Sequence, residues 1–139
     1  MQEEPKKRIQ IPITAVRECL FRELPELRFA YLFGSAATGH MRPDSDVDIA
    51  VDAGSKLGPM TLGRVAGKLK RVVGRDVDLV DILRAPPRLK KSILDHREVL
   101  ATPDNHARLE FEMYTPKIYA DWKIKNRPFE QKLLESFRS

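Results

Sequence analysis

Apolar residues recur along the first two-thirds of the chain with two spacings, one helical and one extended. A helical spacing, bounded by prolines and by Gly74, predicts helices over residues 12–24, 62–73 and 86–94. Short apolar or alternating runs predict strands over residues 28–33, 47–51 and 76–82, and a brief edge strand over 98–101. Gly63 and Gly67 lie four apart on the second helix, where they are expected to permit close packing on a sheet.

The order of these elements predicts the fold class. Helix, strand, strand, helix, strand, helix is typical of a small α/β (α+β) layer with helices against one face of the sheet. A mixed sheet is expected, because the first two strands are joined too closely for a helical crossover between parallel neighbours. A chain of 139 residues fits a single domain with one core.

The last third of the chain differs from the rest. Helical spacing continues through Ala107, Phe111, Tyr114, Ile118 and Trp122. Pro116 interrupts that pattern and is expected to kink or break the helix. A further short apolar stripe follows, formed by Phe129, Leu133 and Phe137. We therefore divide the chain into a core over residues 1–102 and a C-terminal extension of extra helices over 103–139, whose last stripe either folds back on the core or is offered to a partner.

Composition and charge restrict the classes of function. Apolar residues make up 42% of the chain and charged residues 32%, which is typical of a soluble protein. The net charge of +5 comes from scattered basic residues without an RNA-binding signature or paired Cys/His finger, so a nucleic-acid partner is not expected. No apolar run is long enough to span a membrane and residues 1–10 lack a secretory signal, so a cytoplasmic location is expected.

The segment DSDVDIAVD, residues 44–52, places aspartates inside a predicted strand. Aspartate is disfavoured in strands. If the apolar residues Val47, Ile49 and Val51 face the core, Asp46 and Asp48 share the other face, about 6.6 Å apart along the strand. Their repulsion is relieved by divalent cations bound between them, and two-metal phosphoryl-transfer sites hold their ions about 3.5–4 Å apart. Mg²⁺ is suited to such carboxylates and to phosphate oxygens.

A phosphate-binding turn and a third carboxylate complete this candidate site. The strand over residues 28–33 runs into Gly34-Ser35, where a glycine lets phosphate approach the backbone N–H groups and the serine adds a hydroxyl. The third predicted strand offers Asp76 and Asp78 on one face. Periodicity does not choose between the two, and we favour Asp78 because it lies deeper in the strand, between apolar neighbours.

These residues resemble a known signature. Gly34-Ser35, ten residues and then Asp46-Val47-Asp48 resemble the DNA polymerase beta nucleotidyltransferase superfamily. The wider run AYLFGSAATGHMRPDSDVDIAV resembles its smallest branch, the minimal nucleotidyltransferases (MNT). The resemblance is close over residues 27–80 and looser to about residue 122. It implies a nucleotidyltransferase fold in which the Gly-Ser turn holds nucleotide phosphates and two Mg²⁺ ions are bound by the catalytic set Asp46, Asp48 and Asp78.

The resemblance also implies a partner. Several MNT proteins are antitoxins of HEPN/MNT toxin–antitoxin pairs, which transfer AMP from ATP to a tyrosine of the HEPN ribonuclease toxin. This chain departs from the family pattern at Thr38, where a basic residue is common. Arg42 is expected to replace that cation, and Ser45 to join the nucleotide site. Two alternatives remain: an adenylyltransferase, or an antitoxin that inhibits its partner by contact alone.

Overall fold

Four strands form one mixed sheet in the order β3-β2-β1-β4. This computed structural model describes residues 11–39, 42 and 44–136, apart from the side chains of residues 129–131, 133 and 134. The central strand β1 (Phe29–Phe33) pairs antiparallel with both β2 (Val47–Asp52) and β4 (Glu98–Ala101). β2 pairs parallel with β3 (Val77–Asp81). The expected mixed sheet and its brief edge strand are confirmed.

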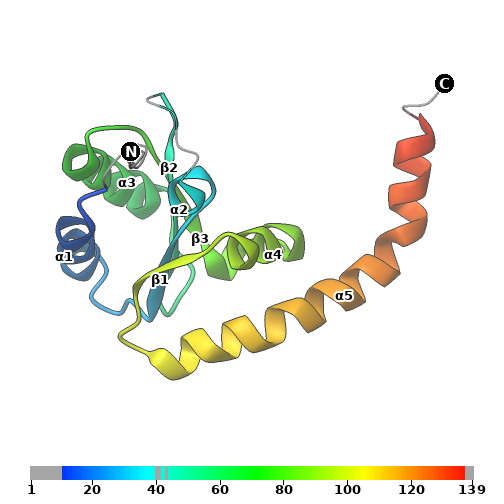
Figure 1. Ribbon diagram of the computed structural model, residues 1–139. Coiled ribbons are helices and arrows are strands. Elements are labelled where there is room, and N and C mark those ends of the chain that lie inside the picture. Colours follow the sequence, from blue (N-terminus) through cyan, green and yellow to red (C-terminus); the bar gives the residue numbers. More distant parts are fainter. Residues whose placement is uncertain (1–10, 40–41, 43, 137–139) are drawn as a thin grey trace, which may run out of the picture.

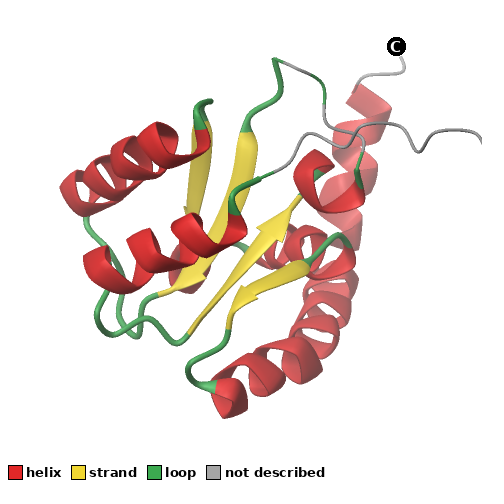
Figure 2. Cartoon of the chain, turned by 60° about the vertical axis from the view of Figure 1, so that its left-hand side comes forward, coloured by secondary structure: helices red, strands yellow, loops and turns green. Residues whose placement is uncertain are grey.

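Helices cover both faces of this sheet, and the expectation of one covered face is wrong (Figures 1 and 2). α1 (Ile13–Glu23) and α3 (Pro59–Val73) enclose one apolar core with the sheet, whereas α4 (Pro87–Asp95) and the start of α5 (Asn105–Ser136) enclose a second. The cause lies in β1, which is apolar at all its positions and fully buried. A strand of that kind needs cover on both faces.

Two short helices complete the fold. α2 (Ser35–Thr38) follows β1 directly, and the 3-10 helix η1 (Ile82–Arg84) follows β3. Gly63 and Gly67 are exposed on α3 and a Cβ on either would meet no atom within 4 Å, so the expected close packing at these glycines is wrong. None of the described helices is both long and apolar enough to cross a membrane.

α5 is one helix that runs through Pro116 and Pro128. Of the kink or break expected at Pro116, the break does not occur. Pro116 is exposed, and a proline inside a helix removes one backbone hydrogen bond and bends the axis without necessarily ending the helix. The helix curves away from the sheet and extends well past α4 (Figure 1). Of the last apolar stripe, Phe137 lies outside the described residues, as do the side chains of Phe129 and Leu133.

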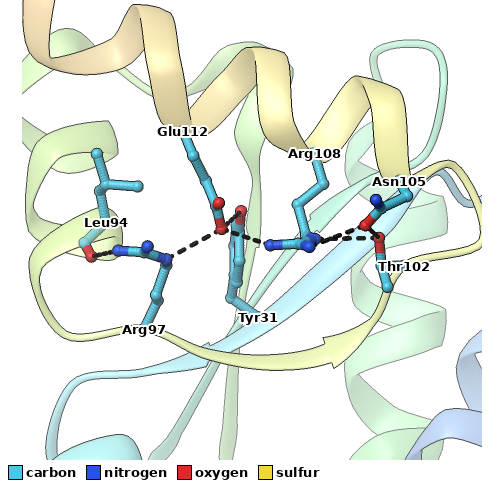
Figure 3. Close-up of polar contacts among 7 residues, drawn as sticks. All are labelled: Tyr31, Leu94, Arg97, Thr102, Asn105, Arg108 and Glu112. Atoms are coloured by element: carbon cyan, nitrogen blue, oxygen red, sulfur yellow. Dashed lines mark hydrogen bonds and ion pairs between the residues drawn. The ribbon is translucent and has the colours of Figure 1, made fainter.

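A polar cluster fastens the first turns of α5 to the sheet (Figure 3). One oxygen of Glu112 accepts hydrogen bonds from the Tyr31 hydroxyl at 3.0 Å, from Arg97 Nε at 3.0 Å and from Arg108 Nη1 at 2.8 Å. Burial opposes ionisation of Glu112, but these donors outweigh it and lower the pKa of that carboxyl. A charged acceptor with several donors is a strong anchor, so the base of α5 is held while its far half projects.

Candidate active site

The carboxylates of β2 and β3 meet at the end of the sheet where β1 finishes. Val47 and Ile49 are buried in the core under α1 and α3, and strand alternation puts Asp48 on the opposite face. Asp48 is the register partner of Phe33, the last residue of β1, and of Asp78 on β3. Neighbouring strands lie about 4.8 Å apart, so the two aspartates are adjacent.

The Gly-Ser turn lies directly over Asp48. Gly34 has φ +65°, a left-handed conformation that side chains rarely adopt, and it leads straight into α2. A Cβ built on Gly34 would lie 2.3 Å from Asp48 Oδ2. Glycine is therefore required both by the backbone conformation and by the approach of the carboxylate. The structure brings together the turn and the acidic strand that the sequence suggested as parts of one site.

Electrostatics at this site are unfavourable without a cation. Burial, followed by the charges of Asp78 and Asp46, raises the pKa of the Asp48 carboxyl above its ordinary value. Among the residues that the structure describes, the side chains of these three aspartates form no ion pair and no hydrogen bond. Their donor chemistry fits a hard divalent cation, which would remove the repulsion. No three acidic, His or Cys side chains among the described residues lie close enough together to coordinate one ion as they stand.

Asp76 and Asp78 differ in their surroundings. Asp76 forms an ion pair with Lys70 of α3 at 2.7 Å and its side chain is 67% exposed. Asp78 has the register position beside Asp48 and acts on the pKa of that residue. Asp78 is exposed, as Asp76 is, so it is the register with Asp48 that favours Asp78 as the third member of the site.

The other aspartates of the two acidic strands have structural roles. Asp52 is buried and forms two hydrogen bonds with the Arg28 guanidinium at 2.8 and 2.9 Å. Asp81 is also buried, and it accepts hydrogen bonds from the backbone N–H groups of Leu57 and Leu83. Both tie chain segments together at the end of β2 and β3 away from Asp48.

The segment between α2 and β2 contains the residues expected to bind nucleotide. Arg42 and Ser45 form a turn, in which Ser45 Oγ accepts a hydrogen bond from the Arg42 N–H at 2.9 Å. The Arg42 side chain is exposed and has no ion pair with another described residue. Thr38 is also exposed, and its hydroxyl donates to the Ser35 carbonyl at 3.3 Å. Sequence reasoning missed Arg75, which contacts this turn from the segment before β3.

A cavity of about 230 Å³ opens on the same face of the sheet but at the opposite end of β2. Arg28 and Asp52 form its floor, with residues of α4 and α5 around it, including Lys90, Phe111 and Tyr114. None of Asp46, Asp48 and Asp78 lines it. The chemistry of the carboxylates is therefore separate from this cavity.

A small mixed sheet that presents adjacent carboxylates beside a Gly-Ser turn defines a nucleotidyltransferase-type site. The family described as "Polymerase beta, Nucleotidyltransferase" matches residues 18–106, more than half of the chain, and the chain belongs to this family. The match includes every residue of the candidate site and ends where α5 begins.

Curated relatives carry more specific names. The chain is 38% identical over 71 residues to the protein adenylyltransferase MntA of Shewanella oneidensis, covering 51% of each protein. It is 35% identical over 66 residues to a putative protein adenylyltransferase of Methanocaldococcus jannaschii, covering 48% of this chain and 71% of that protein. The match therefore spans about half the length of the Shewanella protein.

Solved structures share the whole architecture. One is a chain of a toxin–antitoxin complex crystallised with AMP-PNP, with a TM-score of 0.83, 27% identity and coverage of 89% of this chain and 99% of that one. Another belongs to a tri-AMPylated Shewanella oneidensis HEPN toxin in complex with MNT antitoxin, with a TM-score of 0.75, 25% identity and coverage of 88% and 95%. The family match ends at residue 106, whereas the structural match covers 89% of the 139 residues. The structural similarity therefore continues into α5.

Proposed function

We propose that this protein transfers AMP from ATP to a tyrosine hydroxyl of a HEPN toxin and thereby neutralises that toxin. The observation that carries the proposal is the register pairing of Asp48 with Asp78 beneath the Gly34 turn. The names of the relatives, protein adenylyltransferase and MNT antitoxin in complex with an AMPylated toxin, support the reaction and the acceptor.

Each residue of the site has a role in this proposal. Asp46, Asp48 and Asp78 would hold Mg²⁺, whose charge neutralises the triphosphate and stabilises the leaving pyrophosphate. Gly34 and Ser35 offer backbone and hydroxyl donors to the phosphates at the start of α2, supported by the positive φ of Gly34.

Arg42 and Ser45 complete the nucleotide site. The exposed guanidinium of Arg42 supplies the cation that the family pattern usually has at the position of Thr38, and the Arg42–Ser45 hydrogen bond shapes the turn that carries it.

The transfer is a displacement at phosphorus. The tyrosine oxygen attacks the α-phosphorus of ATP, the bond from that phosphorus to the bridging oxygen breaks, and pyrophosphate leaves with the bonding electrons. The phenolic proton is released to solvent. Phosphoryl-type transfer depends on positioning and charge neutralisation more than on covalent chemistry from the protein, so a small site of carboxylates and a glycine turn suffices.

An exposed side of α5, from Leu109 to Ile124, is the surface we propose for the toxin. Exposed apolar residues follow one side of the helix at spacings of three and four, a set that we call the outer stripe: Leu109, Met113, Pro116, Ala120 and Ile124. Ile124 is 72% exposed and Met113 54%. A continuous exposed apolar stripe is typical of a protein interaction site.

Charges beside the outer stripe indicate the kind of partner surface. Between Pro116 and Pro128 lie four basic residues and one acidic residue: Lys117, Asp121, Lys123, Lys125 and Arg127. Apolar contacts surrounded by basic residues suit an apolar strip on an acidic protein surface. The base of α5 packs on the sheet face that also presents Asp48, so a toxin held by α5 has its tyrosine supplied to the same side of the molecule.

Inhibition by contact alone is the second candidate, and Thr38 favours it because the turn after β1 lacks its usual cation. One experiment separates the two. The toxin is incubated with this protein, ATP and Mg²⁺, and its intact mass and ribonuclease activity are measured. AMP transfer predicts added AMP units and lasting inhibition after the antitoxin is removed. An unmodified toxin that regains activity on separation supports contact alone.

A further inference from the structure

Arg75 connects the start of β3 to the turn that precedes the acidic strand. Its Nη1 atom donates hydrogen bonds to the backbone carbonyl oxygens of Arg42 at 3.1 Å and of Ser45 at 3.4 Å. The turn has two hydrogen bonds of its own, from the Ser45 N–H to the Arg42 carbonyl at 3.0 Å and from the Arg42 N–H to Ser45 Oγ at 2.9 Å. Among the described residues, the other hydrogen bonds of this turn are internal to it, and Arg75 joins the turn to the segment before β3.

The same segment also fixes the residue that follows the turn. The carbonyl of Asp76 accepts a hydrogen bond from the Val47 N–H at 2.8 Å. Asp46 thus lies between Ser45, bound through its carbonyl to Arg75, and Val47, bound through its N–H to Asp76. The backbone on both sides of Asp46 is tied to two consecutive residues of the β3 segment.

We propose that Arg75 is a positioning residue of the nucleotide site, acting through the turn of residues 42–45 to hold Asp46 and Arg42 in place; this rests on the proposed nucleotidyl transfer. Every contact that the structure gives the Arg75 guanidinium is to a backbone carbonyl of the turn, so its influence on substrate passes through that turn. Arginine suits the task because it keeps its charge and presents several donors in a fixed plane. A charged donor to a carbonyl forms a stronger hydrogen bond than a neutral one.

The test combines hydrogen exchange with nucleotide binding. In the protein without nucleotide, Arg75→Gln is expected to speed hydrogen exchange of the Ser45 amide about tenfold. This is the factor that corresponds to the free energy of one charge-assisted hydrogen bond. The affinity for ATP with Mg²⁺, measured by calorimetry, should fall by a similar factor. Arg75→Lys keeps a donor that can reach one carbonyl, so both effects should be smaller.

Arg71→Gln is the matched control. Arg71 is exposed in the last turn of α3, carries the same charge and has no described partner, so its removal should change neither measurement. Unchanged exchange at Ser45 in Arg75→Gln, with the melting temperature preserved, overturns the inference, and so does faster exchange with unchanged ATP affinity. If the unaltered protein binds no ATP, the proposed function fails, while the exchange data still decide whether Arg75 holds the turn.

Discussion

Asp48 lies directly beside Asp78 across the parallel pair of β2 and β3. Among the described residues, no Lys or Arg side chain forms an ion pair with either carboxylate. Strand pairing enforces this contact, because the backbone register leaves neither residue free to move away. Two ionised carboxylates in such a position lower the stability of the folded protein.

Asp48→Asn is expected to raise the stability of the protein in the absence of Mg²⁺. At neutral pH the ionised Asp48 is opposed by burial and by Asp78 and Asp46, so its removal should add stability of up to about 1 kcal/mol, and less if solvent screens the charges. Mg²⁺ should raise the melting temperature of the unaltered protein and not that of the variant. Thermal unfolding with and without Mg²⁺ measures both effects.

The pH dependence of that gain has a definite sign. The pKa of Asp48 is higher in the folded than in the unfolded state, so the folded protein holds the proton more tightly. The stability associated with this proton is present at low pH and is lost as the pH rises through the folded pKa. The advantage of Asp48→Asn should therefore shrink as the pH falls through the folded pKa and be lost below the ordinary aspartate value of 3.8. A variant that is less stable than the parent at neutral pH would contradict the repulsion argument.

Asp78→Asn and Asp76→Asn separate the two carboxylates that periodicity alone does not distinguish. Asp78 neighbours Asp48, so its loss should abolish Mg²⁺-dependent ATP binding and AMP transfer. Asp76 is exposed and paired with Lys70, so its loss should leave both within about twofold and change stability by no more than about 0.5 kcal/mol. Calorimetry with ATP and Mg²⁺ provides the comparison. Equal losses of ATP binding in both variants would contradict the choice of Asp78 over Asp76 as the third carboxylate.

Gly34→Ala should damage the site more than the fold. The new Cβ would fall 2.3 Å from Asp48 Oδ2 on a backbone with φ +65°, so either the carboxylate or the turn must move. We expect a loss of ATP affinity of at least about tenfold and destabilisation of about 1–2 kcal/mol. Gly58→Ala is the control, because a Cβ there meets nothing within 4 Å and the backbone is extended at φ −77°. If both variants bind ATP normally, the close approach of turn and carboxylate has no part in nucleotide binding.

The proximity of the Gly-Ser turn to Asp48 was predictable from the sequence because both parts are carried by short local patterns. The strand that ends in Gly34-Ser35 and the alternation of Asp46, Val47 and Asp48 predict side-chain directions without knowledge of distant contacts. The pairing of Asp48 with Asp78 needs β2 and β3 to be parallel neighbours, which the intervening helix α3 favours. It also needs a register that periodicity does not supply, because Asp76 shares a strand face with Asp78.

Features that depend on long-range contacts were not predictable in the same way. Arg75 was missed because its partners are backbone carbonyls about thirty residues away, and such contacts leave no pattern in side-chain types. The structural role of Asp52 was not predictable, because its partner Arg28 is brought to it by the antiparallel pairing of β1 and β2. Pro116 was given too much weight, because the anchoring of α5 by Glu112 and Phe111 competes with the local cost of a proline.

Substitutions in the outer stripe of α5 test the proposed toxin surface. Met113→Glu and Ile124→Glu place a charge on exposed apolar positions, so they should leave the melting temperature within about 2 °C and weaken toxin binding at least about tenfold. ATP binding should be unchanged, because neither residue is near the carboxylates. Met60→Glu is the control, since Met60 is 90% exposed but lies on α3. Toxin binding that weakens equally in Met60→Glu would point to net charge, and full binding in all three variants would exclude the outer stripe.

Glu112→Ala should loosen α5 from the sheet and destabilise the whole protein. The change leaves the buried Tyr31 hydroxyl and the guanidinium groups of Arg97 and Arg108 without their common acceptor, for a cost of about 2–4 kcal/mol. Glu110→Ala removes the same charge two residues away, where the ion pair found among the described residues is with exposed His106, and should cost no more than about 0.5 kcal/mol. The pKa of Glu112 is lowered in the folded state, so its contribution is present at neutral pH and is lost as the pH falls below the ordinary glutamate value of 4.5. Urea unfolding should therefore show a large difference in stability between the two variants at pH 7 and a much smaller difference at pH 3. Equal stabilities at pH 7 would mean that α5 is held by its apolar contacts alone.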